Sequence, residues 1–371
     1  MRLSRLRVVA TKEFHDHLTS RRFLLIAVLL LLVVSIGLVG GMINYRTAVD
    51  RYAGTIGTVG ESSADPGSAT GVSLLDVFNS VGEQILLIGA ILGIAMGFDL
   101  VTREKEGGSL KLLLSHPIYR DEVINGKGLG GIGAIAGLIF VTFAVVLGVL
   151  LAFGVVPDGY EAFALVVLGL ATLLLVVSYF SVALFISTIS RTGGTALVAA
   201  LVVFIVLSSL LPVFVDPNVV GVFMGPPPAP PSLSPPGLAG TQSVGAVEPA
   251  LVPGSGNGSD VTGIEESQRY ERELQAYEER RLSLEGVISL FSPTLNFRQV
   301  MRELNTPVLT SVASAGTGSG LPDESPAEPE APMASVPNVV ESILPNLIAL
   351  LVIPALFFGL AYARFMRMDI R

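Results

Sequence analysis

The chain has 371 residues, of which 51% are apolar and only 15% are charged. Soluble proteins average about 25% charged residues, so this composition excludes two or three soluble domains and indicates a polytopic membrane protein. Cysteine is absent, and the formal net charge is −8. Disulfides, thiolate metal sites and cysteine nucleophiles are therefore excluded, and the charge argues against a protein that binds nucleic acid.

Six apolar stretches are each long enough to cross a bilayer as a helix, which takes about 20 residues. We therefore expect an all-α membrane protein with six transmembrane helices. The expected spans are residues 22–43, 78–98, 130–153, 163–186, 195–214 and 343–363. Glycines spaced four apart within these spans are typical of closely packed helices, and they are Gly37/Gly41, Gly89/Gly93/Gly97 and Gly133/Gly137.

The distribution of charge predicts how these spans are oriented. The N-terminal segment, the loop 99–127, the loop at Arg191 and the C-terminal tail carry 15 of the 23 Lys and Arg residues. Basic segments stay in the cytoplasm, so both termini are expected to be cytoplasmic in a multi-pass protein of the cell membrane. The opposite segments carry 23 of the 31 acidic residues, an excess typical of a surface that works in high salt.

The N-terminal segment, residues 1–21, has an apolar pattern of its own. Apolar residues recur there at steps of three and four, with basic residues between them, and they are Leu3, Leu6, Ala10, Phe14 and Leu18. This pattern predicts an amphipathic helix that lies in the inner membrane interface. The alternative is a solvated basic tail that only enforces the orientation.

The rest of the chain divides into residues 22–215 with spans one to five, an external segment 216–342, and residues 343–371 with the sixth span and the tail. The first external loop, 44–77, is rich in Gly and Ser and is expected to be a connector. The segment 216–342 holds 17 of the 23 Pro residues and is expected to be partly disordered.

Three local features stand out within the segment 216–342. Interleaved Glu and Arg predict a charged helix over 264–284. A short amphipathic element is expected over 290–301, at the outer interface. Asn257 begins an Asn-x-Ser sequon, which is either a glycosylation site or a chance match.

The usual signatures of an enzyme are missing. No phosphate-binding loop of the G-x-x-x-x-G-K-[ST] type occurs, so this chain is not expected to hydrolyse ATP or to hold a cofactor. Gly128, Gly130 and Gly133 match a dinucleotide-binding pattern, but they open a membrane span and no strand precedes them. We therefore expect this match to be accidental and the glycines to serve helix packing.

Few ionisable side chains are available for ion chemistry. His15 and His17 flank Asp16, but residues two apart on a helix point to different sides, so no metal site is expected. Glu83 and Asp99 lie near the two ends of the second span, and no relay of carboxylates connects them. A proton-coupled pump is therefore disfavoured, and the energy for any transport must come from elsewhere.

The loop 99–127 is the most informative stretch of the chain. Gly107-Gly108 is expected to break the helix that leaves the membrane, and residues 109–115 are expected to form a short amphipathic helix that Pro117 ends. A rigid element with both charge signs suits docking into a groove of a soluble partner. The alternative is an ordinary inside loop whose cations obey the positive-inside rule.

Several residue patterns occur together in this chain. They are Arg103-Glu104-x-Glu106-Gly107, Leu112-Leu113-Leu114-Ser115-x-Pro117-x-x-Arg120 and Gly126-Lys127 in the loop, Lys12-Glu13-Phe14 and Ser20-Arg21-Arg22 before span one, Ser187–Arg191 between spans four and five, and Ser292-Pro293 before span six. With the six spans, they resemble ABC-2 type transporter permeases. The segment 216–342 is larger than the outer element usual in that family.

The resemblance implies a permease subunit, with a fold of six helices, that pairs with a second permease copy and docks separate ABC ATPase subunits. It implies that ATP acts on the partner and that the direction is export. It also implies coupling roles for Arg103, Glu104, Glu106, Gly107, Leu112, Leu113, Pro117, Arg120 and Arg191.

Two other functions are alternatives to that of a permease subunit. One is a non-transport membrane scaffold whose external segment binds a cell-surface partner. The other is an intramembrane hydrolase, which is disfavoured because the spans hold no polar constellation that could run the reaction.

Overall fold

A computed structural model of the chain describes residues 2–58, 74–108, 119–225, 228, 259–316 and 336–368. Every regular element in these ranges is helical, as the composition predicted. The elements are α1 (Arg2–Thr19), α2 (Arg21–Thr58), α3 (Leu74–Gly97), α4 (Thr102–Glu106), α6 (Arg120–Ala152), α7 (Gly159–Ile189), α8 (Gly193–Ile205), the π-helix η1 (Val206–Leu210), α9 (Leu211–Val213), α10 (Pro217–Met224), α11 (Ser259–Phe291), α12 (Pro293–Gly316) and α13 (Val336–Met366).

Six helical stretches in the described ranges are long and apolar enough to cross a membrane, which confirms the expected number. They are Arg21–Thr47, Val77–Glu106, Arg120–Ala152, Gly159–Ile189, Gly193–Val213 and Val339–Met366. The expected connector 44–77 is wrong in its first part, because α2 continues as a helix to Thr58. The Gly and Ser content of the loop predicted an irregular segment, but the helix of the first span continues into the first part of the loop.

The chain forms two compact units. Unit 1 comprises Met1–Leu211 and Ser289–Arg371, and unit 2 comprises Pro212–Ile288. Unit 2 contains α10 and most of α11, whose charged stretch includes the expected helix 264–284 and an ion pair of 2.9 Å between Arg269 and Glu273. Within unit 2, the Tyr277 hydroxyl donates to the carbonyl of Gly225. Asn257 lies outside the described residues.

Glycines let the spans of unit 1 approach closely, as their spacing predicted. A Cβ on Gly93 would come within 2.5 Å of the carbonyl oxygen of Val176, and a Cβ on Gly97 would come equally close to that of Phe180. The backbones of α3 and α7 are therefore in direct contact. Gly137 differs, because a Cβ there would meet no described atom within 4 Å.

A proline interrupts α13, and serine hydroxyls donate hydrogen bonds to backbone carbonyls of two spans. Pro354 lies inside α13 and cannot donate to the carbonyl of Leu350, which instead accepts a hydrogen bond of 3.3 Å from Ser178 of α7. Ser292, at the break between α11 and α12, donates to the carbonyl of Leu207 in the π-helix at 2.7 Å. Backbone groups freed inside the membrane are thus satisfied by side chains.

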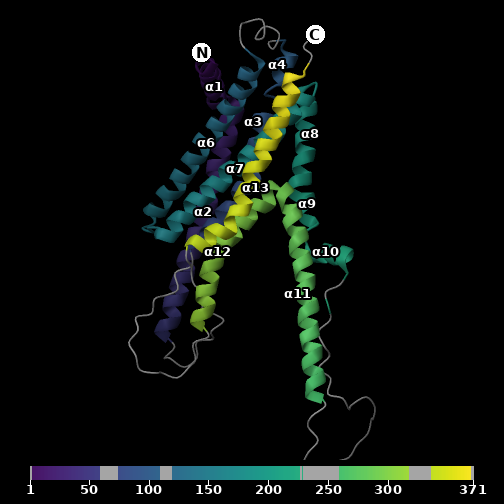
Figure 1. The fold of residues 1–371 in the computed structure, drawn as a ribbon. Helices are drawn as coiled ribbons and strands as arrows, with labels where there is room; N and C mark the ends of the chain where they lie inside the picture. The colour runs from purple at the N-terminus through teal and green to yellow at the C-terminus, as the bar shows by residue number, and fades with distance from the viewer. Residues whose placement is uncertain are drawn as a thin grey trace, which may run out of the picture. The chain divides into compact units, whose positions relative to one another are not determined.

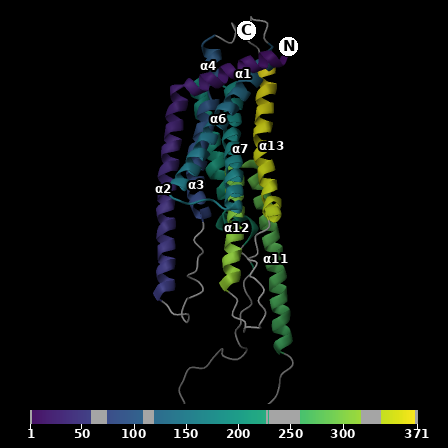
Figure 2. The same ribbon diagram turned by 90° about the vertical axis from the view of Figure 1, so that its left-hand side faces the viewer.

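One end of unit 1 gathers segments that are far apart in the sequence. Figure 1 shows α4 and the C-terminal end of α13 at the same end as α1. Figure 2 shows α1 running across the ends of the spans rather than along them. The expected amphipathic helix before span one is therefore present, and it lies next to the loop between spans two and three.

Candidate functional site

The predicted break in the loop 99–127 is present. The chain leaves α3 through a turn, forms the single-turn helix α4, and continues through Gly107 to Gly108, whose φ of +67° suits glycine. Residues 109–118 lie outside the described ranges, so the expected short helix 109–115 and the candidates Leu112, Leu113 and Pro117 lie outside them as well. The described chain resumes at Tyr119.

A buried lysine of α6 joins two other helices at this end. The ammonium nitrogen of Lys127 lies 3.0 Å from a carboxylate oxygen of Glu13 in α1 and 2.7 Å from one of Glu104 in α4. The side chains of Lys127, Glu13 and Glu104 are 4%, 10% and 17% exposed. Because a buried charge is costly without a partner, the Lys127 ammonium of α6 holds both α1 and α4.

Glycines of α6 form the seat on which α1 lies. A Cβ on Gly126 would come within 2.5 Å of Val9, and a Cβ on Gly130 would come within 2.6 Å of the Cβ of Glu13. Nothing larger than glycine fits there without a shift of α1. The backbone of α1 is thus close enough to α6 for Glu13 to reach Lys127.

Helix α4 is also fastened to α7. The ammonium of Lys105 donates to the carbonyls of Ser187, Thr188 and Ser190 at 3.3, 2.8 and 3.1 Å, and these carbonyls lie at the C-terminal end of α7, where Ser190 is the C-cap. A cation at a helix C-terminus satisfies carbonyls that have no partner within the helix. The backbone N–H of Thr102 donates to the hydroxyl of Ser187 at 3.1 Å.

Two further contacts connect the loop to α8 and α13. The carboxylate of Glu106 accepts a hydrogen bond of 2.9 Å from the backbone N–H of Gly193, in the first turn of α8. At the other end of the loop, the guanidinium of Arg120 donates to the carbonyl of Met368 at 2.8 Å. The two ends of the loop are thus joined to α8 and to the chain that follows α13.

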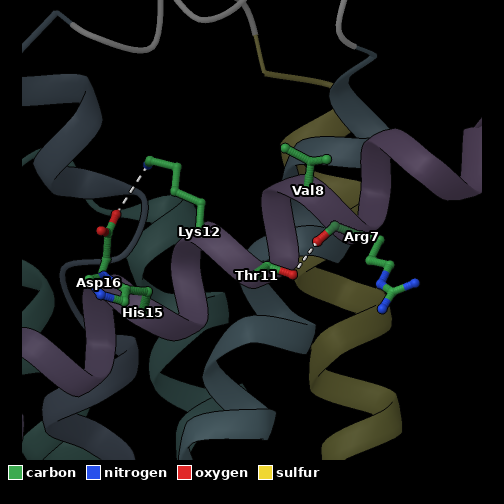
Figure 3. A pocket seen from close by; sticks show the side chains of 6 residues that line it. All are labelled: Arg7, Val8, Thr11, Lys12, His15 and Asp16. Carbon is green, nitrogen blue, oxygen red and sulfur yellow. Dashed lines mark hydrogen bonds and ion pairs between the residues drawn. The ribbon is translucent and has the colours of Figure 1, made fainter.

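The side of α1 that faces away from the other helices bears a shallow hollow. Figure 3 shows that its six lining residues all come from α1. Lys12 and Asp16 form an ion pair of 3.2 Å along it. Partial burial lowers the pKa of Lys12, but the nearby Glu13 and Asp16 carboxylates outweigh this and raise the pKa above its ordinary value. His15 lies on this side, whereas His17 is half-buried.

A sequence model of the family described as ABC-2 family transporter protein matches residues 7–370, nearly the whole chain. The chain belongs to the ABC-2 family. The resemblance seen in the loop and in the N-terminal segment is thereby confirmed, and the chain is a permease subunit of an ABC transporter. The family implies pairing with an ABC ATPase subunit. A search of curated proteins finds no match to the chain.

The loop residues implied by the ABC-2 resemblance have different places in the structure. Glu104 lies in a buried junction that it forms with Glu13 and Lys127. Glu106 contacts α8, and Arg120 contacts the chain at the end of α13. Arg103 and Arg191 are exposed. Gly107 caps α4. The loop thus divides into residues that fix it to the spans and residues left at the surface.

The sequence analysis did not predict the contacts of three charged residues, Glu13, Lys105 and Lys127. Glu13 and Lys127 belong to patterns that carried the ABC-2 resemblance, but no role was assigned to them, and Lys105 was counted only as a cytoplasmic charge. Beside the expected apolar stripe of α1, Glu13 is buried, while Phe14 of the stripe is 36% exposed. A carboxylate at an apolar position of the helical repeat was the available signal.

Proposed function

We propose that this ABC-2 permease is the transmembrane half of an exporter whose ATP is hydrolysed on a separate ABC ATPase, docked where the loop 99–127 leaves the spans. The observation that carries this proposal is the fastening of α4. Through Glu104, Lys105 and Glu106, one short helix contacts α6, α7 and α8. An element fixed to so many spans is suited to passing a push from a partner into the membrane.

The same arrangement supports the proposed orientation. The ends that carry α1, α4 and the end of α13 lie together (Figure 1), and the basic residues of the sequence concentrate on these segments. Under the positive-inside rule this end is cytoplasmic, and with it both termini of a protein of the cell membrane. A cytoplasmic ATPase would meet the loop there.

Two features of the chain support an energy source on a separate protein. The sequence has no phosphate-binding loop. Glu83, the carboxylate within the second span, is paired with Arg298 of α12 through two contacts of 3.1 and 3.0 Å. A carboxylate engaged in this way is poorly suited to a proton relay. We therefore assign ATP hydrolysis to the partner, and neither a catalytic nor a cofactor role to this chain.

A second permease copy completes the proposed assembly, and lipid surrounds it. One permease supplies one coupling loop, whereas an ABC ATPase pair offers two docking surfaces. Many large apolar side chains of the spans are exposed in the single chain, among them Phe140 and Val166. In a membrane these side chains face lipid or the second copy.

The test of this function is binding and stimulation of the cognate ABC ATPase by the permease in lipid nanodiscs. Replacing Leu112 and Leu113 together by Ser should weaken binding by about tenfold or more, because apolar anchors at the centre of an interface dominate its affinity. The exposed Glu279 of α11 offers a control, as Glu279→Gln. Undiminished binding by the double variant would overturn the assignment of the loop.

A further inference from the structure

The Lys127 ammonium is a single group that serves two carboxylates from two helices. Glu13 belongs to α1, which crosses the ends of the spans, and Glu104 belongs to α4, at the exit of the loop. All three side chains are largely withdrawn from solvent. The two ion pairs of 3.0 and 2.7 Å are therefore poorly screened by water and salt.

Direct packing between α1 and α4 is sparse among the described residues, whereas α1 packs extensively on α6. Two other contacts of α4 point elsewhere, to the end of α7 through Lys105 and to α8 through Glu106. The Lys127 side chain thus connects the loop to the N-terminal helix through its two ion pairs.

This connection constrains how the three helices can move. If α4 shifts, either Lys127 follows it or the 2.7 Å ion pair between Lys127 and Glu104 breaks in a buried place, which is unfavourable. If Lys127 follows, Glu13 is drawn along for the same reason. The glycine seat at Gly126 and Gly130 favours a movement of α1 as a unit, since close backbone packing allows two arrangements more readily than gradual deformation.

We infer that Lys127 is a positioning residue that transmits a displacement of α4 to the N-terminal helix α1. The position of α1, like that of the two spans that flank the loop, would then depend on the nucleotide state of the ATPase. The inference rests on the proposed function, because the displacement of α4 comes from the docked ATPase.

The absence of cysteine from the chain allows a direct test. Spin labels are placed on Thr11→Cys, on the exposed side of α1, and on Val156→Cys, in the exposed turn between α6 and α7. Their distance is measured by pulsed electron paramagnetic resonance in the complete permease–ATPase complex in nanodiscs, with ADP and with ATP plus vanadate. The expected result is a shift of about 2 Å or more between the two states.

The decisive variant combines Glu13→Gln, Glu104→Gln and Lys127→Met. It removes all three buried charges, so it avoids the two buried negative charges that Lys127→Met alone would leave without the Lys127 ammonium. The matched control removes another interhelical ion pair of the same unit through Glu83→Gln and Arg298→Met. The shift is expected to disappear in the triple variant and to persist in the control.

Each outcome has a separate meaning. A shift that persists in the triple variant, or no shift in a parent complex that binds and stimulates its ATPase, would overturn the inference and leave the proposed function standing. A parent permease that neither binds nor stimulates the ATPase would overturn the proposed function itself, and the inference with it.

Discussion

The guanidinium of Arg22 lies 2.6 Å from the carboxylate of Asp99, although 77 residues separate them in the chain. Arg22 lies at the start of the first span and Asp99 in the turn that follows α3, so this pair ties two spans together beside the buried junction. Its side chains are 67% and 22% exposed. Solvent therefore weakens this ion pair, in contrast to the pairs of Lys127.

Asp99→Asn should change the free energy of unfolding by less than about 1 kcal/mol, because exposed ion pairs contribute little. The measurement is thermal or denaturant unfolding of the purified permease in a fixed detergent. A much larger loss would show that Asp99 has a structural role beyond this pair.

Lys127→Met should lower the free energy of unfolding by about 3–5 kcal/mol, because it removes the buried cation that lies against the carboxylates of Glu13 and Glu104. Adding Glu13→Gln and Glu104→Gln should restore most of that loss, since a neutral junction needs no counter-charge. The same unfolding measurement compares the single and triple variants. If the single variant is as stable as the parent, the junction is open to water.

Gly130→Ala should loosen α1, because the added methyl group would lie 2.6 Å from the Cβ of Glu13 and must displace the helix. Overpacking of this kind costs about 1–3 kcal/mol. Hydrogen exchange should become faster along α1. The control is Gly137→Ala on the same helix, where the methyl group meets no described atom within 4 Å. Equal exchange in the two variants would contradict the seat assigned to Gly130.

Acid should also loosen α1, through His17. Burial lowers the pKa of His17; the carboxylates of Glu13, Asp99 and Asp16 raise it and the Lys127 ammonium lowers it, but burial prevails. The neutral form of His17 is thus favoured in the folded state. It contributes fully to the stability of the fold at a pH above the pKa of the unfolded chain, about 6.5. This contribution is lost as the pH falls through the lower pKa that His17 has in the folded state.

Hydrogen exchange of α1 between pH 7.5 and 5 measures this loss. His17→Gln should remove the dependence on pH, whereas His15→Gln, on the outward side, should retain it. A pH response that survives His17→Gln would assign it to another group.

The orientation of the spans can be measured on the same cysteine-free background. Thr11→Cys should resist a membrane-impermeant maleimide added to whole cells, and Val156→Cys, which is 76% exposed, should react. The positive-inside distribution is the physical reason. The reverse pattern would place the loop 99–127 outside and remove the basis for a cytoplasmic ATPase.

The sequence by itself determined the six spans, the helix before them and the break at Gly107-Gly108, because these depend on local hydropathy, helical periodicity and backbone freedom. It also placed Glu104 and Glu106 in a family pattern. The tertiary structure decided which charges meet. Lys127 and Glu13 are 114 residues apart, and only the close approach of α1 to Gly126 and Gly130 brings them to 3.0 Å. Pairing across helices depends on how the helices pack, which local pattern does not specify.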